Sequence, residues 1–137
     1  MSQYMLLVYE QEVEAAEQAE RERVTPMLVE LHAGLREAGL LVGVHRLHST
    51  ASATSVRVRA GETEIVDGPF ALTKEVLAGY YVLECADLDE ALEHAARLPM
   101  APWATIEVRP IMPAEEWLDT ARRAGVSLTD EDVRHLA

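Results

Sequence analysis

Asp67 and Lys74 lie in a short segment between two predicted strands and are the side chains best suited to chemistry. Gly68-Pro69 fixes a tight turn that leaves the Asp67 carboxylate at the end of a strand. Lys74 is the single lysine among twelve basic residues, and its spacing allows the loop to fold back over Asp67. A carboxylate beside an ammonium group can transfer a proton and hold an anionic or phenolic substrate. The alternative is that Asp67 accepts hydrogen bonds from backbone amides of its own turn.

His32 is the candidate partner for Asp67. It lies at the edge of the apolar stripe of a predicted helix, where it can reach a cleft between that helix and the sheet. There it would act as a base, and the alternative is a half-exposed histidine at the boundary of the core. His45 and His48 are three residues apart on a predicted strand, so they point to opposite faces and do not share a metal ion. No metal site and no cofactor are therefore expected.

Three further side chains are candidates for binding a substrate: Arg57, Arg109 and Tyr80. Arg109 shares one strand face with Glu107, so these two can pair with each other or with Arg57, and anion binding is the second use. Tyr80 and Tyr81 point to opposite faces of one strand. One of them can therefore line a pocket while the other packs in the core.

The length and charge of the chain limit what it can be. Its 137 residues are enough for one domain, and a hydrophobic content of 49% supplies a core. A formal net charge of −12 disfavours nucleic acid and anionic membrane surfaces as partners. The first residues lack a basic region, and their apolar run is too short for a signal or a membrane span. The single cysteine, Cys85, falls in a predicted buried strand, which favours a core residue, and we expect a cytoplasmic protein.

Hydropathy patterns predict an α+β fold of the ferredoxin-like (split βαβ) type. Apolar residues that repeat at three and four positions predict a helix ending at Gly39, and Asp87 with Glu90 forms a capping box for a second helix. The predicted strands cover residues 4–9, 41–48, 54–60, 63–66, 79–86 and 105–109. The order is β-α-β, a β-hairpin insertion, then β-α-β, which builds an antiparallel sheet. Val42 and Val44 are expected on one face of their strand.

Residues 113–137 are predicted to form a C-terminal helical extension that follows a domain of residues 1–112. Two helices cover only one face of the predicted sheet, whereas the strands at 4–9 and 79–86 are apolar on both faces. A second copy of the chain is the simplest cover for the other face. The expected assembly is a homodimer of the dimeric α+β barrel type, with its sheet faces opposed.

The segment Asp67-Gly68-Pro69-Phe70, with Thr73-Lys74-Glu75, resembles the signature of the DGPF branch of the YCII-related domain family. Further matches in register are Leu41-Val42-Gly43, Ala53-Thr54-Ser55-Val56-Arg57, Asp89-Glu90-Ala91-Leu92 and Ile106-Glu107-Val108-Arg109-Pro110. The resemblance spans roughly residues 4–112. It implies a ferredoxin-like α+β fold assembled as a dimer.

The resemblance also implies where a site would lie. In the YCII branch, the proposed site pairs a helix histidine with the aspartate of a turn, and some relatives are linked to elimination chemistry on hydroxylated aromatic rings. The aspartate corresponds to Asp67. Leu28 stands at the histidine position, and Leu72 replaces a glutamate that is common after the motif. A small molecule is therefore expected in a cleft near the DGPF loop.

Two functions remain open. The first is an acid–base enzyme, lyase- or isomerase-like, acting on a small hydroxylated or anionic metabolite. Its catalytic residues would be Asp67 and His32, and its substrate-binding residues Lys74, Arg109, Arg57 and Tyr80. The second is a non-catalytic dimeric module for interaction or regulation, which the absence of the helix histidine favours. Lys74 and the charged strand positions, set beside an apolar core, favour the enzyme.

Overall fold

The computed structural model describes residues 1–136 of the chain, which contain six strands and five α-helices. The strands are β1 (Ser2–Glu10), β2 (Leu41–Arg46), β3 (Thr54–Arg59), β4 (Glu62–Asp67), β5 (Val76–Cys85) and β6 (Thr105–Pro110). The helices are α1 (Ala15–Arg21), α2 (Thr25–Glu37), α3 (Leu88–Ala96), α4 (Ala114–Arg123) and α5 (Asp130–Leu136), and two short 3-10 turns are η1 (Glu22–Val24) and η2 (Thr50–Ser52). The last residue of the predicted extension, Ala137, lies outside the described residues.

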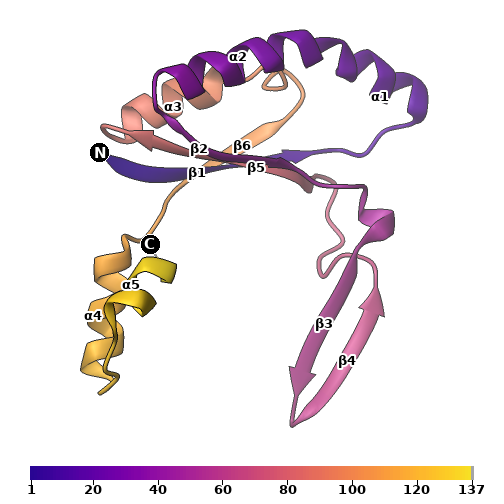
Figure 1. Cartoon of the computed structure of the whole chain (residues 1–137). Coiled ribbons are helices and arrows are strands. Elements are labelled where there is room, and N and C mark those ends of the chain that lie inside the picture. Colours follow the sequence, from indigo (N-terminus) through magenta and orange to yellow (C-terminus); the bar gives the residue numbers. More distant parts are fainter. Residues whose placement is uncertain (137) are drawn as a thin grey trace.

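Four antiparallel strands form the main sheet, in the order β2-β5-β1-β6. Helices α1, α2 and α3 lie over one face of this sheet (Figure 1). The order confirms the predicted ferredoxin-like α+β fold, in which the two central strands come from the two βαβ halves. Within the described residues the sheet stays open and does not close into a barrel.

The hydrophobic core lies between the helices and the covered face of the sheet. Alternate residues of the central strands are buried there, namely Tyr4, Leu6 and Val8 of β1 and Tyr81, Leu83 and Cys85 of β5. Leu35 of α2 and Ala91 and Ala95 of α3 pack against them. The predicted burial of Cys85 is confirmed. The intervening residues point to the opposite face and remain half-buried.

The ends of the helices follow the predicted signals. Gly39 has a φ of 74° and ends α2, because a left-handed residue at this place favours glycine. The Asp87 side chain accepts a hydrogen bond from the Glu90 N–H at 2.9 Å, and so caps α3. Both predictions are confirmed.

A β-bulge in β2 changes which side chains reach the core. Leu41 pairs with Leu83, and Gly43 pairs with Val82, the adjacent residue of β5. Val42 is therefore an extra residue in β2. A bulge reverses the alternation of faces beyond it. Val44 therefore packs against the core, whereas Val42 is exposed. The prediction that the two valines share a face is wrong.

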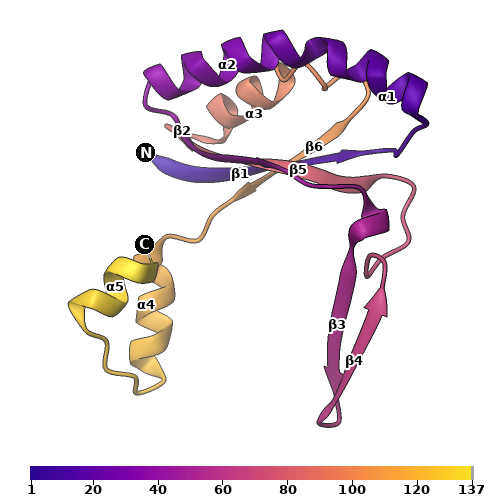
Figure 2. The same ribbon diagram turned by 45° about the vertical axis from the view of Figure 1, so that its right-hand side comes forward.

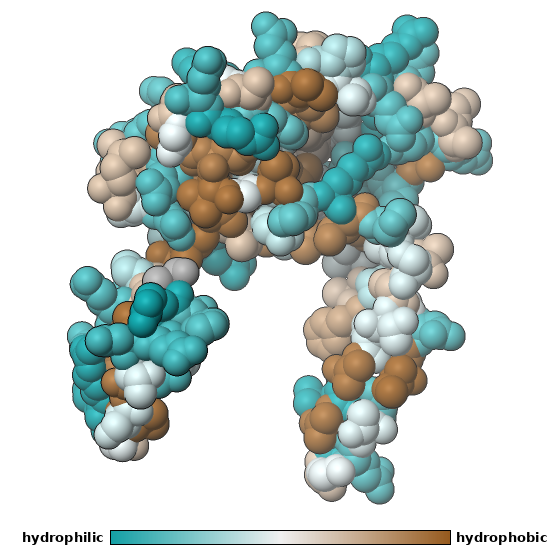
Figure 3. Space-filling model, viewed as in Figure 1, coloured by the Kyte–Doolittle hydropathy of each residue, from teal (hydrophilic) through white to brown (hydrophobic). Residues whose placement is uncertain are grey.

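The hairpin of β3 and β4 forms a separate two-stranded sheet. It extends away from the main sheet on the side opposite to the helices (Figures 1 and 2). Ala60 and Gly61 turn the chain with φ values of 50° and 78°, as a two-residue hairpin loop with both residues at positive φ requires. Apolar side chains along the hairpin are exposed (Figure 3), among them Val56, Val58, Ile65 and Val66.

Helices α4 and α5 pack against each other on the same side as the hairpin, away from the main sheet (Figures 1 and 2). Asp132 accepts a hydrogen bond from the Thr129 N–H at 2.8 Å and donates its own N–H to the Thr129 hydroxyl at 3.1 Å. Leu118 is buried in this helical pair, whereas Trp117 is half exposed. In the described chain, no helix combines the length and the apolar character needed to cross a bilayer.

Candidate functional site

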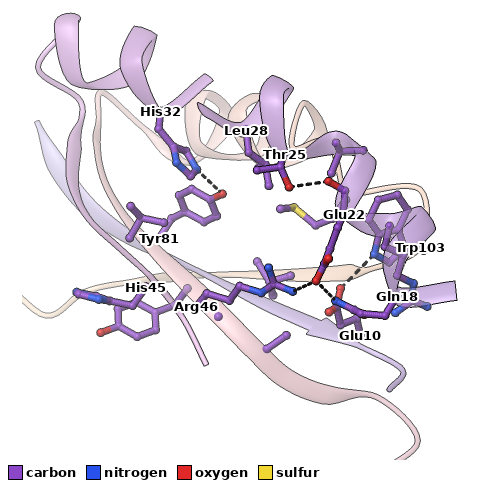
Figure 4. A pocket seen from close by; sticks show the side chains of 18 residues that line it. Glu10, Gln18, Glu22, Thr25, Leu28, His32, His45, Arg46, Tyr81 and Trp103 are labelled. Atoms are coloured by element: carbon purple, nitrogen blue, oxygen red, sulfur yellow. Dashed lines mark hydrogen bonds and ion pairs between the residues drawn. The ribbon is translucent and has the colours of Figure 1, made fainter. Parts of the chain in front are cut away.

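A pocket opens between the helices and the covered face of the sheet, below α1, η1 and the first half of α2 (Figure 4). Its volume is about 150 Å³. Apolar side chains line its middle, including Val8 of β1, Leu28 of α2 and Val44 of β2. Met100 and Trp103, from the segment after α3, complete the wall. The pocket lies between the sheet and the first long helix, and none of its lining residues belongs to the DGPF loop, near which the cleft was expected.

One end of the pocket holds a histidine–tyrosine pair. The Nε2 atom of His32, from α2, lies 2.8 Å from the hydroxyl oxygen of Tyr81, from β5. This distance is that of a hydrogen bond, and the rings meet edge to face with their centroids 5.3 Å apart. Both residues line the pocket, and their polar atoms point toward one another between α2 and the sheet (Figure 4).

Burial favours the neutral forms of both members of this pair. Burial, with a smaller contribution from Arg36, lowers the pKa of His32. Burial also raises the pKa of Tyr81 to about 12. At neutral pH the imidazole is therefore uncharged and the phenol keeps its proton. A neutral imidazole can accept a proton, and a protonated phenol can donate a hydrogen bond. The pair therefore suits acid–base chemistry or recognition of a ligand hydroxyl.

The other end of the pocket is charged. Arg46 of β2 lies 3.6 Å from the Glu22 carboxylate. Glu10 accepts a hydrogen bond from the Trp103 indole N–H at 3.1 Å, and the Arg21 guanidinium lies over the same indole, 5.8 Å from the ring centroid. The pocket mouth therefore carries two acidic and two basic side chains, whose charges balance.

Asp67 lies at the end of β4 in the projecting hairpin and does not line the pocket. Its turn is held by the backbone, because the Gly68 N–H donates a hydrogen bond to the Ala53 carbonyl at 2.8 Å. Gly68 has a φ of 103°, which favours glycine at this position of the motif. Lys74 is exposed in the loop that leads to β5. The structure thus brings neither Asp67 nor Lys74 to His32 within one chain.

The two predicted arginines make structural contacts outside the pocket. The Arg57 guanidinium lies over the Phe70 ring of the DGPF turn, 5.2 Å from its centroid. Arg109 of β6 forms an ion pair with Glu107 at 2.6 Å, which is one of the two pairings that the sequence predicts for Arg109. Both arginines are exposed, and neither lines the pocket.

The two neighbouring tyrosines have different places. Tyr80 contributes to the pocket lining, but its ring meets the ring of His45, with the centroids 5.4 Å apart, on the sheet face without helices. Tyr81 is buried and carries the hydroxyl that meets His32. The signal for choosing Tyr81 is its alternation with Leu83 in a strand whose core face is buried.

Metal-ligating side chains do not gather in this pocket. Across the described residues, the group whose ligand atoms come together is Cys85, Glu90 and His94, where β5 leads into α3. None of these three residues lines the pocket. The pocket itself, with its apolar middle and its hydroxyl–imidazole pair, suits an organic ligand better than an ion.

Two comparisons with known proteins match most of the chain. The YCII-related domain matches residues 2–115 of the chain, which span the main sheet, the hairpin and α1 to α3. An uncharacterised protein of Rhizobium meliloti (strain 1021) is 45% identical over 112 residues, which are 79% of this chain and 90% of that protein. The match to the domain stops at the beginning of α4, so most of the helical pair α4–α5 lies outside it.

Proposed function

This chain belongs to the YCII-related domain family, and we propose that it binds a small hydroxylated ring compound in the pocket between α2 and the sheet. The observation that carries the proposal is the 2.8 Å hydrogen bond between His32 and Tyr81 at one end of a pocket whose middle is apolar. Apolar walls with a few convergent polar groups are the usual makeup of a ligand site.

The size of the pocket supports a ligand of about one ring. Its volume, about 150 Å³, matches that of an engineered apolar cavity that holds benzene. The balanced charges of Glu10, Glu22, Arg21 and Arg46 at the mouth favour a neutral hydroxylated ring over a strongly anionic one.

His32 is the proposed base within this pocket. The ligand hydroxyl takes the place of the direct His32–Tyr81 hydrogen bond. Its proton passes to Nε2 of the neutral imidazole, and Tyr81, whose pKa is raised to about 12, stays protonated and donates its hydrogen bond to the ligand oxygen that develops charge. Asp67 takes no part in this step within one chain, because it lies in the hairpin. A protein that binds the same ligand without turnover is the alternative, and an assay of product formation on the bound compound separates the two.

Ligand binding is tested by titrating the full chain with phenol, catechol and cyclohexanol and following binding by ligand-observed NMR and by the shift in melting temperature. We expect phenol or catechol to bind the wild-type protein, and His32→Gln and Tyr81→Phe to weaken binding at least about tenfold. His48→Gln and Lys74→Met, at exposed positions outside the pocket lining, are control variants that should bind like wild type. Binding that is equal in all variants, or absent from the wild type, would overturn the proposal.

The proposed assembly is a homodimer formed through the sheet face without helices. That face carries half-buried apolar residues of the central strands, namely Met5, Leu7, Tyr9 and Val82. The hairpin and the α4–α5 pair extend on the same side (Figure 2), with Trp117 and the apolar hairpin residues exposed. An isolated hairpin is only marginally stable in water. A second copy that packs between the hairpin and the α4–α5 pair would bury the apolar sheet face and stabilise the hairpin.

A further inference from the structure

Cys85, Glu90 and His94 place a thiol, a carboxylate and an imidazole together where β5 leads into α3. One ligand atom from each residue lies within 4.8 Å of the others. Glu90 and His94 are one helical turn apart on α3 and share one face of the helix. Cys85 is the last residue of β5. A short turn follows it, and α3 then lies over the Cys85 side chain.

The Glu90 carboxylate is held in place by the cap of its own helix. One oxygen, Oε2, accepts a hydrogen bond from the Ala86 N–H at 2.6 Å. The other oxygen, Oε1, lies 3.7 Å from Nε2 of His94. This separation is too long for a hydrogen bond but close to the distance of about 3.4 Å between two ligand atoms on one tetrahedral ion, given metal–ligand bonds of about 2.0–2.2 Å.

We propose that Cys85, Glu90 and His94 bind a divalent transition-metal ion of the Zn²⁺ class, with water as the fourth ligand. Sulfur, nitrogen and oxygen donors together favour such an ion over Mg²⁺ or Ca²⁺, which prefer oxygen ligands. On binding, the Cys85 sulfur forms a bond to the metal and its proton leaves to water. The site joins the end of β5 to α3 and is separate from the pocket that contains His32.

The environment of the three residues is compatible with an ion. The Cys85 side chain is fully buried, whereas Glu90 and His94 keep 31% and 17% of their side chains exposed. An ion can therefore reach the cluster from the solvent side of α3 and retain a water molecule there. The carboxylates of Glu90 and Asp87 provide a negative potential beside Cys85 that attracts a cation.

The test uses Co²⁺ as a spectroscopic substitute for Zn²⁺, added to the full-length protein. Cobalt bound by a thiolate absorbs in the near ultraviolet, so this absorption reports the Cys85 bond directly. We expect saturation at one Co²⁺ per chain, loss of the absorption when excess Zn²⁺ is added, and no thiolate absorption in Cys85→Ala. His94→Ala should weaken binding by more than about tenfold, because even the loss of an outer partner of a metal ligand costs 10–100-fold.

A matched control and a second variant keep the test decisive. His48→Ala removes an exposed histidine outside the cluster and should titrate like wild type. If Cys85→Ala fails to fold because Cys85 is buried, His94→Ala at its partly exposed position still decides the question. A wild-type protein without thiolate absorption at saturating Co²⁺, or a titration that His94→Ala leaves unchanged, would overturn the proposal.

Discussion

His32 and Tyr81 join the helix layer to the sheet through a hydrogen bond of 2.8 Å between Nε2 and the phenol oxygen. The two residues are 49 positions apart in the sequence, so only the folded chain brings them together. The bond crosses one end of the pocket and places two polar atoms beside its apolar middle. It therefore links the stability of the α2–β5 contact to the chemistry of the site.

Replacing Tyr81 by phenylalanine should lower the free energy of unfolding by about 1 kcal/mol, the usual net contribution of one hydrogen bond in a protein. The loss arises because the His32 imidazole is partly buried and loses its partner. Urea denaturation followed by circular dichroism measures it. Tyr80→Phe is the matched control, since the Tyr80 ring lies on the opposite face. Equal losses in the two variants would show that the bond to His32 contributes nothing.

The pH dependence of stability should contain a contribution from His32. Burial first, and Arg36 second, lower the pKa of His32 below its ordinary value of 6.5, so the unfolded chain binds the proton more readily. Stability from this group is present above pH 6.5 and is lost as the pH falls through the lower pKa of the folded state. His32→Gln should flatten the decrease of stability as the pH falls below about 6.5.

Two comparisons make the pH measurement specific. His48→Gln, at an exposed position, should keep the wild-type pH profile. Glu12 contributes to the pH dependence of stability at a lower pH than His32 does. Hydrogen bonds from the backbone and side chain of Thr50 lower the pKa of Glu12 below 4.5. Its stabilising contribution is likewise lost only as the pH falls below that value. A His32→Gln variant whose stability falls with the wild-type slope just below pH 6.5 would contradict the assignment.

Much of the fold could be predicted from local patterns. The apolar residues on both faces of β1 and β5 indicated central strands, and the helix ends at Gly39 and Asp87 carry signals that act within one turn. The bulge at Val42 was missed because the same apolar pattern fits a regular strand. A single extra residue reverses the face of every later side chain in the strand. Whether the strand is bulged or regular is decided by packing against α2 rather than by the hydropathy pattern.

The positions of the candidate site residues follow less directly from the sequence, for a different physical reason. The place of His32 beside the pocket could be predicted, because the edge of an apolar stripe follows from helical geometry. The partner assigned to it, Asp67, lies in the hairpin instead, and the direction in which a hairpin leaves a sheet is set by tertiary contacts. Tyr80 and Tyr81 differ only in the face they occupy, which the alternation alone leaves undecided until the position of the helices is known. Cys85 and His94 fall in different elements, so their spacing carries no metal-binding signature.

Gly79 should not tolerate a larger side chain. A Cβ atom added there would lie 2.7 Å from the backbone carbonyl oxygen of His45, which cannot move without shifting β2. We expect Gly79→Ala to lower the free energy of unfolding by about 1–3 kcal/mol, as overpacking does. Gly34→Ala is the matched control, because a Cβ on that α2 residue meets nothing within 4 Å. It should raise stability by about 0.5–1 kcal/mol, and thermal unfolding that ranks the two variants in the reverse order would refute the argument.

The sheet face without helices should determine the oligomeric state. Size-exclusion chromatography with light scattering should give the wild-type protein about twice the 15.2 kDa mass of one chain. Leu7→Glu places a charge at the centre of that face, where Leu7 pairs with Tyr80 on one side and Glu107 on the other. Burying this carboxylate in a dimer is costly, so we expect a monomer at micromolar concentration. Val29→Glu, on the exposed surface of α2, should remain dimeric. A wild-type protein that elutes as a monomer would show that a second copy does not cover the face.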